Sequence, residues 1–251
     1  SATNTRLPDG AACLIVQYPN FFGYIEDLAS YQIQTQNAGA MFVVSADPVA
    51  MGLFKSPGEY GADIVTGEGQ GIGVPMSYGG PYVGLFCTRS QFVRQMPGRL
   101  VGRTVDQDGE IGYVLTLQTR EQHIRRERAT SNICTSQALL ALATTITLAS
   151  LGRQGLRHVA ELCYHKSHYA ASIISNIPGY SLPLSGVFFK EMVVQCPENP
   201  DIVNERLLEK GIVGGLNISD QMPNCMLLCV TEMNSRQQID DMTNVLREFS
   251  Q

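Results

Sequence analysis

The chain has 251 residues, 44% of them hydrophobic and 16% charged, with 24 glycines and no tryptophan. This composition is that of a globular protein and excludes a disordered or fibrous one. A formal net charge of −5 and a pI near 5.4 give no basic field for a polyanion, so we expect no nucleic acid among the partners.

Targeting signals and metal sites are not predicted. The sequence has no run of about 20 apolar residues and its first residues are polar, so we expect neither a membrane span nor a signal peptide. Cys225 and Cys229 share one face of a predicted strand, but they lack a nearby histidine and favour core positions over a zinc site. His165 and His168, one turn apart on a predicted helix, are interpreted as surface histidines. The seven scattered cysteines indicate buried thiols in a reducing cytoplasm: Cys13, Cys87, Cys134, Cys163, Cys196, Cys225 and Cys229.

Strand and helix signals alternate in the first third. Residues 11–17 and 40–45 read as strands, and residues 24–36 read as the helix between them, which predicts a βαβ unit with parallel strands. Pro48 cannot continue a central strand, so Asp47 lies at the carboxyl end of the second strand. In open parallel sheets this edge is where ligands bind.

A third predicted strand, 62–66, leads into a glycine-rich loop, 67–84. Six glycines and two prolines between positions 67 and 82 exclude a helix or a central strand, and they indicate close approach of a ligand or another backbone. Ile72 stands where a dinucleotide fingerprint needs its third glycine, and the loop lacks the lysine of a P-loop. A nucleotide site is therefore not favoured.

The remaining chain predicts a strand at 83–88, a brief helix at 90–96 and a long excursion without a clear period over 97–113. An arginine-rich helix is predicted at 119–128, where Arg120, Arg125, Arg126 and Arg128 line either an ion-paired interface or a solvated face. Capping residues at 130–132 precede further helices, and an α+β layer with helices on one face is expected. The helices are predicted at 134–151, 155–176, 200–210 and 236–248, and the strands at 188–196, 212–213 and 226–231.

Long sequence blocks resemble the alpha subunit, or subunit 1, of the glycine cleavage system P-protein family. The blocks are VSADP (44–48), PGEYGADIV (57–65), GEGQ (67–70), MSYGGPYVG (76–84), MPGRLVG (96–102), LTLQTREQHIRRE (115–127), ATSNICT (129–135), GIVGGL (211–216) and CVTEM (229–233). They span nearly the whole chain but match only the later part of such a subunit, so we expect a fragment that lacks elements of the large domain.

The resemblance implies an α/β protein with the fold of pyridoxal-phosphate-dependent transferases, type I. In that fold a seven-stranded large domain is followed by an α+β small domain. We expect residues 1–118 to form the later part of the large domain, with its mostly parallel sheet, and residues 119–251 to form the C-terminal small domain.

The chain lacks a lysine at the position that the resemblance assigns to the cofactor. Loss of carbon dioxide from glycine leaves a carbanion that pyridoxal phosphate stabilises, and a lysine must hold this cofactor between turnovers. None of the four lysines follows the strand at 62–66, and Gln70-Gly71-Ile72 occupies the place of the partner subunit's His-Lys-Thr. Asp47 matches the carboxylate that pairs with the pyridine nitrogen, although a strand-capping Asp-Pro turn is the favoured interpretation. Asp47, Gln70 and Gly71 are thus vestigial candidates, and no catalytic or cofactor-binding residue is predicted.

The functional hypothesis is a non-catalytic partner within an oxidoreductase, glycine dehydrogenase (decarboxylating). This subunit assists glycine decarboxylation and transfer of the aminomethyl group to the lipoamide of the H-protein. Pyridoxal phosphate is then expected on the beta subunit of a cytoplasmic heterotetramer. An independent pyridoxal-phosphate enzyme, of the aminotransferase or desulfurase type with an unrecognised lysine, is the alternative. A scaffold without a part in catalysis is a third interpretation.

Overall fold

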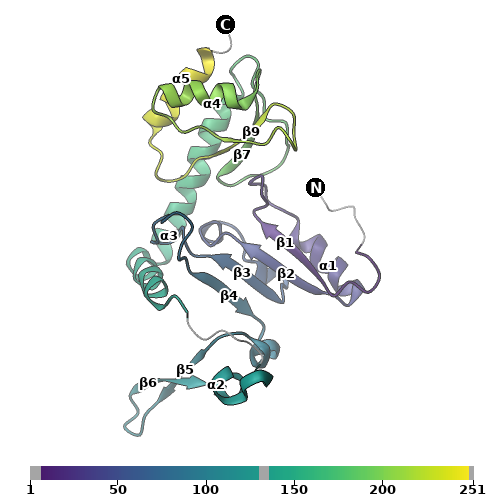
Figure 1. The fold of residues 1–251 in the computed structure, drawn as a ribbon, viewed down its shortest axis with the longest axis vertical. Helices are drawn as coiled ribbons and strands as arrows, with labels where there is room; N and C mark the ends of the chain where they lie inside the picture. The colour runs from purple at the N-terminus through teal and green to yellow at the C-terminus, as the bar shows by residue number, and fades with distance from the viewer. Residues whose placement is uncertain (1–6, 130–135, 249–251) are drawn as a thin grey trace.

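The computed structural model describes residues 7–129 and 136–248. A sheet near the N-terminus and a smaller α+β layer near the C-terminus are joined by one long helix (Figure 1). A hairpin projects from the end of the molecule that lies opposite the α+β layer (Figure 1). The predicted capping residues at 130–132, and Cys134, lie outside the described residues.

The four-stranded sheet follows the predicted βαβ pattern. Its strands are β1 (Cys13–Tyr18), β2 (Met41–Ala46), β3 (Ile64–Glu68) and β4 (Gly84–Thr88), in the order β1-β2-β3-β4. The first three run parallel and β4 pairs antiparallel with β3, so the predicted mostly parallel sheet is confirmed. Side chains of β2 alternate between half-buried and buried, as a strand packed more tightly on one face requires.

Helix α1 (Leu28–Ala38) begins four residues later than predicted. The Asp27 side chain accepts a hydrogen bond from the Ser30 amide at 3.2 Å and so caps the helix, while Gly39 ends it in the left-handed conformation, with φ of 64°. The buried residues Leu28, Tyr31 and Thr35 share one face, which packs on the sheet core.

The predicted excursion at 97–113 contains strands that were not predicted, because a projecting hairpin forms there (Figure 1). Strands β5 (Leu100–Val105) and β6 (Ile111–Thr116) pair antiparallel around a turn in which the Asp106 carboxylate accepts from the Asp108 and Glu110 amides. Gly109 follows with φ of 83°. The Asp-Gly pair at 108–109 is the sequence signal for this turn.

The arginine-rich helix is also shorter than predicted. Helix α2 covers only Gln122–Arg125, with 3₁₀ turns on either side. Leu117 and Arg126 have φ of 53° and 52°, and such positive values interrupt helical geometry.

Two predicted helices form one kinked element, α3 (Ala138–Ile174). Gly152 lies inside it with φ of 62° and ψ of −178°, a conformation that is essentially restricted to glycine. The predicted break at Gly152 is therefore confirmed. Within the described residues, no helix is long and apolar enough to cross a membrane.

The C-terminal layer is a three-stranded antiparallel sheet, in the order β7-β9-β8, with helices on one face. Its strands are β7 (Glu191–Gln195), β8 (Leu216–Asn217) and β9 (Cys225–Cys229), and its helices are α4 (Pro200–Glu209) and α5 (Arg236–Glu248). Met192, Val194, Met226 and Leu228 on one face share a hydrophobic core with residues of α4, α5 and the second half of α3, so the predicted α+β layer is confirmed.

The strand predicted at 212–213 is wrong, since pairing begins only at Leu216. A Cβ on Gly214 would lie 2.1 Å from the Asn204 Oδ1 atom, and one on Gly215 would lie 2.7 Å from the Leu227 carbonyl oxygen. At these two glycines the chain passes close to α4 and β9 before strand β8 begins at Leu216. Val213 meanwhile remains 88% exposed.

Candidate functional site

A cavity of about 440 Å³ lies where the carboxyl edge of the four-stranded sheet meets the start of β7. Its charged lining residues are Asp47, Glu68, Lys190 and Glu191, of which three are acidic and one is basic. Gln70 and Gly71 also line it, so the structure brings all three vestigial candidates into one cavity. The full lining is Gln17, Pro19, Asn20, Phe21, Ser45, Ala46, Asp47, Pro48, Glu68, Gln70, Gly71, Lys190, Glu191 and Leu227.

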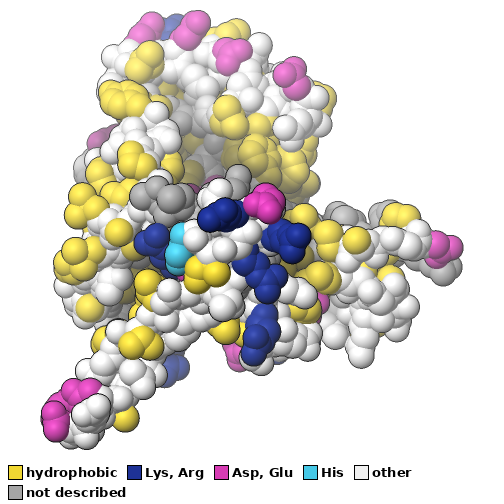
Figure 2. Space-filling model, turned by 60° about the horizontal axis from the view of Figure 1, so that its bottom comes forward, with side chains coloured by type: hydrophobic (Ala, Val, Ile, Leu, Met, Phe, Trp, Pro, Cys, Tyr) yellow, Lys and Arg dark blue, Asp and Glu magenta, His cyan; other side chains and the backbone are white. Residues whose placement is uncertain are grey.

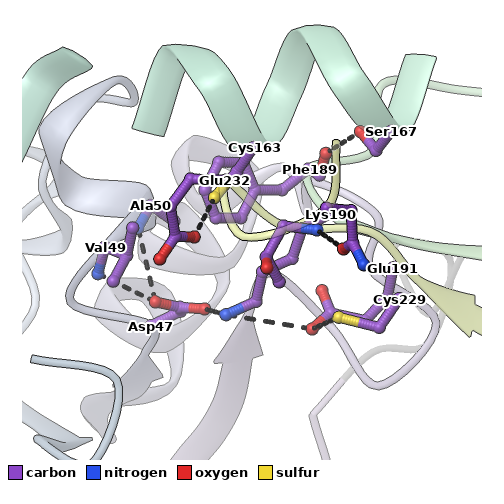
Figure 3. A network of polar contacts seen from close by, with 12 residues as sticks. Asp47, Val49, Ala50, Cys163, Ser167, Phe189, Lys190, Glu191, Cys229 and Glu232 are labelled. Atoms are coloured by element: carbon purple, nitrogen blue, oxygen red, sulfur yellow. Dashed lines mark hydrogen bonds and ion pairs between the residues drawn. The ribbon is translucent and has the colours of Figure 1, made fainter. Parts of the chain in front are cut away.

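Asp47 uses its two carboxylate oxygens differently. Oδ1 accepts hydrogen bonds from the amides of Val49 at 2.8 Å and Ala50 at 3.4 Å, which is the turn-capping role favoured from the sequence. Oδ2 lies 2.5 Å from the Lys190 ammonium nitrogen (Figure 3). Lys190, which lies far along the chain, thus forms an ion pair with Oδ2, the oxygen of Asp47 that takes no part in capping.

Lys190 was missed as a site residue. Its side chain is 21% exposed, and its Nζ atom also lies 4.0 Å from Glu191 Oε1. Burial opposes the charge, but the Asp47 and Glu191 carboxylates outweigh it, so that the pKa of Lys190 is raised. The sequence signal was a lysine inside the apolar run 188–194, because a cation there needs a carboxylate partner.

Glu191 completes the charged cluster. Burial, opposed by Lys190 and reinforced by Asp47, raises the pKa of this carboxyl group. The Cys229 thiol donates to Glu191 Oε1 at 3.7 Å and is exposed. The predicted core position of Cys229 is therefore wrong, because Cys229 is the last residue of β9 and its side chain is not covered. Cys225 is buried as predicted.

Gln70 and Gly71 face the cavity without reaching Asp47. Gln70 ties its own loop together, since its amide donates to Glu68 Oε1 at 3.1 Å and its Nε2 atom donates to the Val74 carbonyl oxygen at 2.9 Å. A Cβ on Gly71 would meet Val49 Cγ2 at 3.7 Å, an ordinary contact. Position 71 therefore has room for a side chain.

Other glycines of the loop are required for contacts within the protein. A Cβ on Gly67 would lie 2.8 Å from the Ala46 carbonyl oxygen, one on Gly69 would lie 2.5 Å from Val83, and one on Gly73 would lie 1.9 Å from Thr147 Oγ1. Close approach of other parts of the chain, rather than of a ligand, accounts for these three positions.

The remaining candidates lie outside this cavity. Arg125, Arg126 and Arg128 are exposed, and Glu121 pairs with Arg99 at 3.5 Å. Lysine and arginine side chains gather near the middle of the face that Figure 2 shows. His168 is not the surface histidine predicted, because its ring stacks between two aromatic rings. Among the described residues no group of three or more potential ligands forms a metal site. The six described cysteines are free thiols, and Cys13, Cys87 and Cys229 are exposed rather than buried as predicted.

The fold and the position of this cavity define the class of protein. Solved structures of type I pyridoxal-phosphate enzymes share the fold, such as a cysteine desulfurase from Thermococcus onnurineus with a TM-score of 0.65 at 20% identity, matching 96% of this chain and 60% of that one. A crystal structure of glycine decarboxylase (P-protein) of the glycine cleavage system, in inhibitor-bound form, gives a TM-score of 0.91 at 39% identity and matches 99% of this chain and 58% of that one.

The chain belongs to the glycine cleavage system P-protein family, whose model matches residues 2–246. It is 56% identical to the probable glycine dehydrogenase (decarboxylating) subunit 1 of Thermomicrobium roseum over 96% of this chain and 55% of the relative. It is 52% identical to the protein of the same name from Desulforamulus reducens over 94% of this chain and 53% of the relative. The chain thus spans about half the length of these relatives.

The residues of this cavity do not fit pyridoxal phosphate. Gly71 has no amine to bind the cofactor, and the Lys190 ammonium group already holds the free oxygen of Asp47. Among the described lining residues Lys190 is the only cation, whereas Asp47, Glu68 and Glu191 bring three carboxylates toward any phosphate. A phosphate carries a charge of about −1.5 to −2, so these three carboxylates disfavour it.

Proposed function

We propose that this chain is part of the alpha subunit of glycine decarboxylase, the P-protein, and that the lysine which binds the cofactor lies on the beta subunit. The observation that carries the proposal is the ion pair between the Lys190 amine and Asp47. The sequence resemblance, which sets Gly71 where the partner subunit carries its lysine, supports it. Identity to proteins named subunit 1 supports it, since that name implies a second subunit.

In this role the subunit assists a reaction whose chemistry takes place beside it. Glycine loses carbon dioxide, and the aminomethyl group passes to the lipoyl arm of the H-protein. Pyridoxal phosphate on the partner supplies the electron sink that stabilises the carbanion. The chain contributes the wall of an active site within a cytoplasmic heterotetramer, and it leaves covalent chemistry to the partner.

The test uses the full-length subunit with and without its partner. Each sample is incubated with pyridoxal phosphate, reduced with borohydride and examined by mass spectrometry. We expect a pyridoxyl adduct on the partner and none on this subunit. A stable adduct on this subunit alone would defeat the proposal.

The rival is an independent pyridoxal-phosphate enzyme of the aminotransferase or desulfurase type. It requires a lysine that reaches the cofactor carbonyl, and Lys190 is held at the Asp47 end of the cavity instead. Visible cofactor absorbance in the purified subunit alone would support the rival. A scaffold without a catalytic contribution would leave glycine–bicarbonate exchange by the partner unchanged when this subunit is omitted, whereas we expect exchange to require it.

A further inference from the structure

The backbone that carries Lys190 is anchored by hydrogen bonds to neighbouring segments. The Phe189 amide donates to the Gly23 carbonyl oxygen at 2.9 Å, and the Lys190 carbonyl oxygen accepts from the Val230 amide at 2.9 Å. Ser167 Oγ donates to the Phe189 carbonyl oxygen at 2.6 Å, and the Phe189 side chain is fully buried. The lysine therefore starts from a rigid point at the rim of the cavity (Figure 3).

Asp47 receives the amine in the geometry of a charge-assisted hydrogen bond. The N–O distance of 2.5 Å is at the short end for an ammonium donor on a carboxylate. A protonated pyridine ring donates to a carboxylate in the same way, from the ring atom opposite the carbon that bears its aldehyde. Lys190 thus stands where that ring nitrogen would stand, and it cannot reach the aldehyde carbon from there.

We propose that Lys190 is an internal substitute for the coenzyme ring, which neutralises Asp47 and closes this cavity to pyridinium-type ligands. The inference deepens the proposed function and rests on it in one respect, namely that the native cavity takes no cofactor. It adds a cause. Under the proposed function, the lack of a lysine at position 71 is not the sole reason why this cavity takes no cofactor, since the Asp47 carboxylate that would receive the ring is also occupied.

Position 71 makes this inference testable, because a Cβ there meets nothing closer than 3.7 Å. In the full-length subunit without its partner, four proteins are compared: the native chain, Gly71→Lys, Lys190→Met and the double variant. Each is incubated with pyridoxal phosphate, reduced with borohydride and mapped by peptide mass spectrometry. Gly71→Lys combined with Lys210→Met is the matched control, since it removes an exposed lysine and retains Lys190.

We expect an adduct at position 71 in the double variant, at a yield about tenfold or more above that of Gly71→Lys alone. If Lys190 is paired with Asp47 for more than about nine-tenths of the time, less than a tenth of the Gly71→Lys protein has a free Asp47 to receive the cofactor. This fraction gives the expected factor of about ten. The Lys210 control should match Gly71→Lys. Lys190→Met has no amine at position 71 and should show no adduct there.

Equal yields in Gly71→Lys and the double variant would overturn the inference while leaving the proposed function intact. The absence of any adduct in a folded double variant would overturn it as well. An adduct at Lys190 in the native chain would instead defeat the proposed function. These failures are therefore distinguishable by the position of the label.

A second measurement covers a variant that folds poorly. Thermal unfolding is compared for the native chain, Asp47→Asn, Lys190→Met and the variant with both changes. We expect the paired change to lower the melting temperature by clearly less than the sum of the two single losses, since each single change leaves one charged group without its partner. A paired loss equal to that sum or greater would show that the two groups do not stabilise one another, and the inference would fail.

Discussion

At the scale of single residues, His168 shows how packing fixes a charge state. Its ring lies between those of Tyr164 and Phe188, with centroids 4.0 Å away on each side, and its Nδ1 atom lies 3.0 Å from the Tyr164 carbonyl oxygen. Burial, with a contribution from His165, lowers the pKa of His168 from its ordinary value of 6.5. The folded protein therefore keeps this ring neutral at pH values where an unfolded histidine is charged.

This environment predicts an acid-dependent loss of stability. As the pH falls below 6.5, the unfolded state binds a proton at His168 that the folded state does not bind, so the free energy of unfolding decreases. His168→Phe keeps the stacking and removes the titration. We expect it to lose less stability than the native chain between neutral pH and about pH 5.

Urea unfolding at several pH values measures the difference. His158→Gln, a change at an exposed histidine, is the control and should follow the native profile. Identical pH profiles for His168→Phe and the native chain would contradict the prediction.

The sequence predicted part of the site at this scale. Asp47 was placed at a strand end because proline follows it, and Gly71 was placed in the loop by its neighbours; both signals are local. Lys190 lies more than a hundred residues further along the chain and approaches Asp47 only after the small layer has docked. No local pattern encodes that pairing, since it depends on tertiary packing.

At the scale of elements, the glycine-rich loop contains positions with opposite requirements. Gly73 has φ of 77°, and a Cβ there would lie 1.9 Å from Thr147 Oγ1 on α3. Gly71 has neither constraint. The sequence alone does not distinguish among these glycines, and only the structure separates those that the fold requires from those, such as Gly71, that it does not.

A matched pair of alanine substitutions tests this difference. We expect Gly73→Ala to reduce the free energy of unfolding by about 2–4 kcal/mol, because it combines backbone strain with overpacking against α3. Gly71→Ala should change it by less than about 0.5 kcal/mol. Denaturant unfolding measures both, and similar costs for the two variants would refute the assignment.

The missed hairpin has a physical cause. Helix α5 and strand β2 have clear periodicity and were found. The hairpin β5–β6 carries exposed apolar side chains on Val101, Val105 and Tyr113, so it lacks the alternation that burial of one face imposes.

At the scale of the whole molecule, the four-stranded sheet and the C-terminal three-stranded layer are joined at Gly23 as well as through α3. The Phe189 amide donates to the Gly23 carbonyl oxygen, and the Ile25 amide donates to the Val187 carbonyl oxygen, both at 2.9 Å. A Cβ on Gly23 would lie 2.1 Å from the Glu191 carbonyl oxygen. This close contact sets the position from which Lys190 reaches Asp47.

Gly23→Ala is therefore expected to separate the segment after β1 from the start of β7. Gly10 is a matched control, because its φ of 77° resembles the 86° of Gly23 and a Cβ there meets nothing within 4 Å. We expect Gly23→Ala to cost about 2 kcal/mol or more beyond Gly10→Ala, as overpacking does. Equal melting temperatures for the two variants would show that the junction tolerates the side chain.

The Asp47–Lys190 pair also bears on the history of such a chain. Changing either partner alone strands a charge in a cavity that already holds Glu68 and Glu191. A descendant that regained an anchoring amine at position 71 would still meet an occupied carboxylate, so a single mutational step brings no benefit. Under the proposed function, the Asp47–Lys190 pair therefore makes it difficult for this cavity to acquire the cofactor through single substitutions.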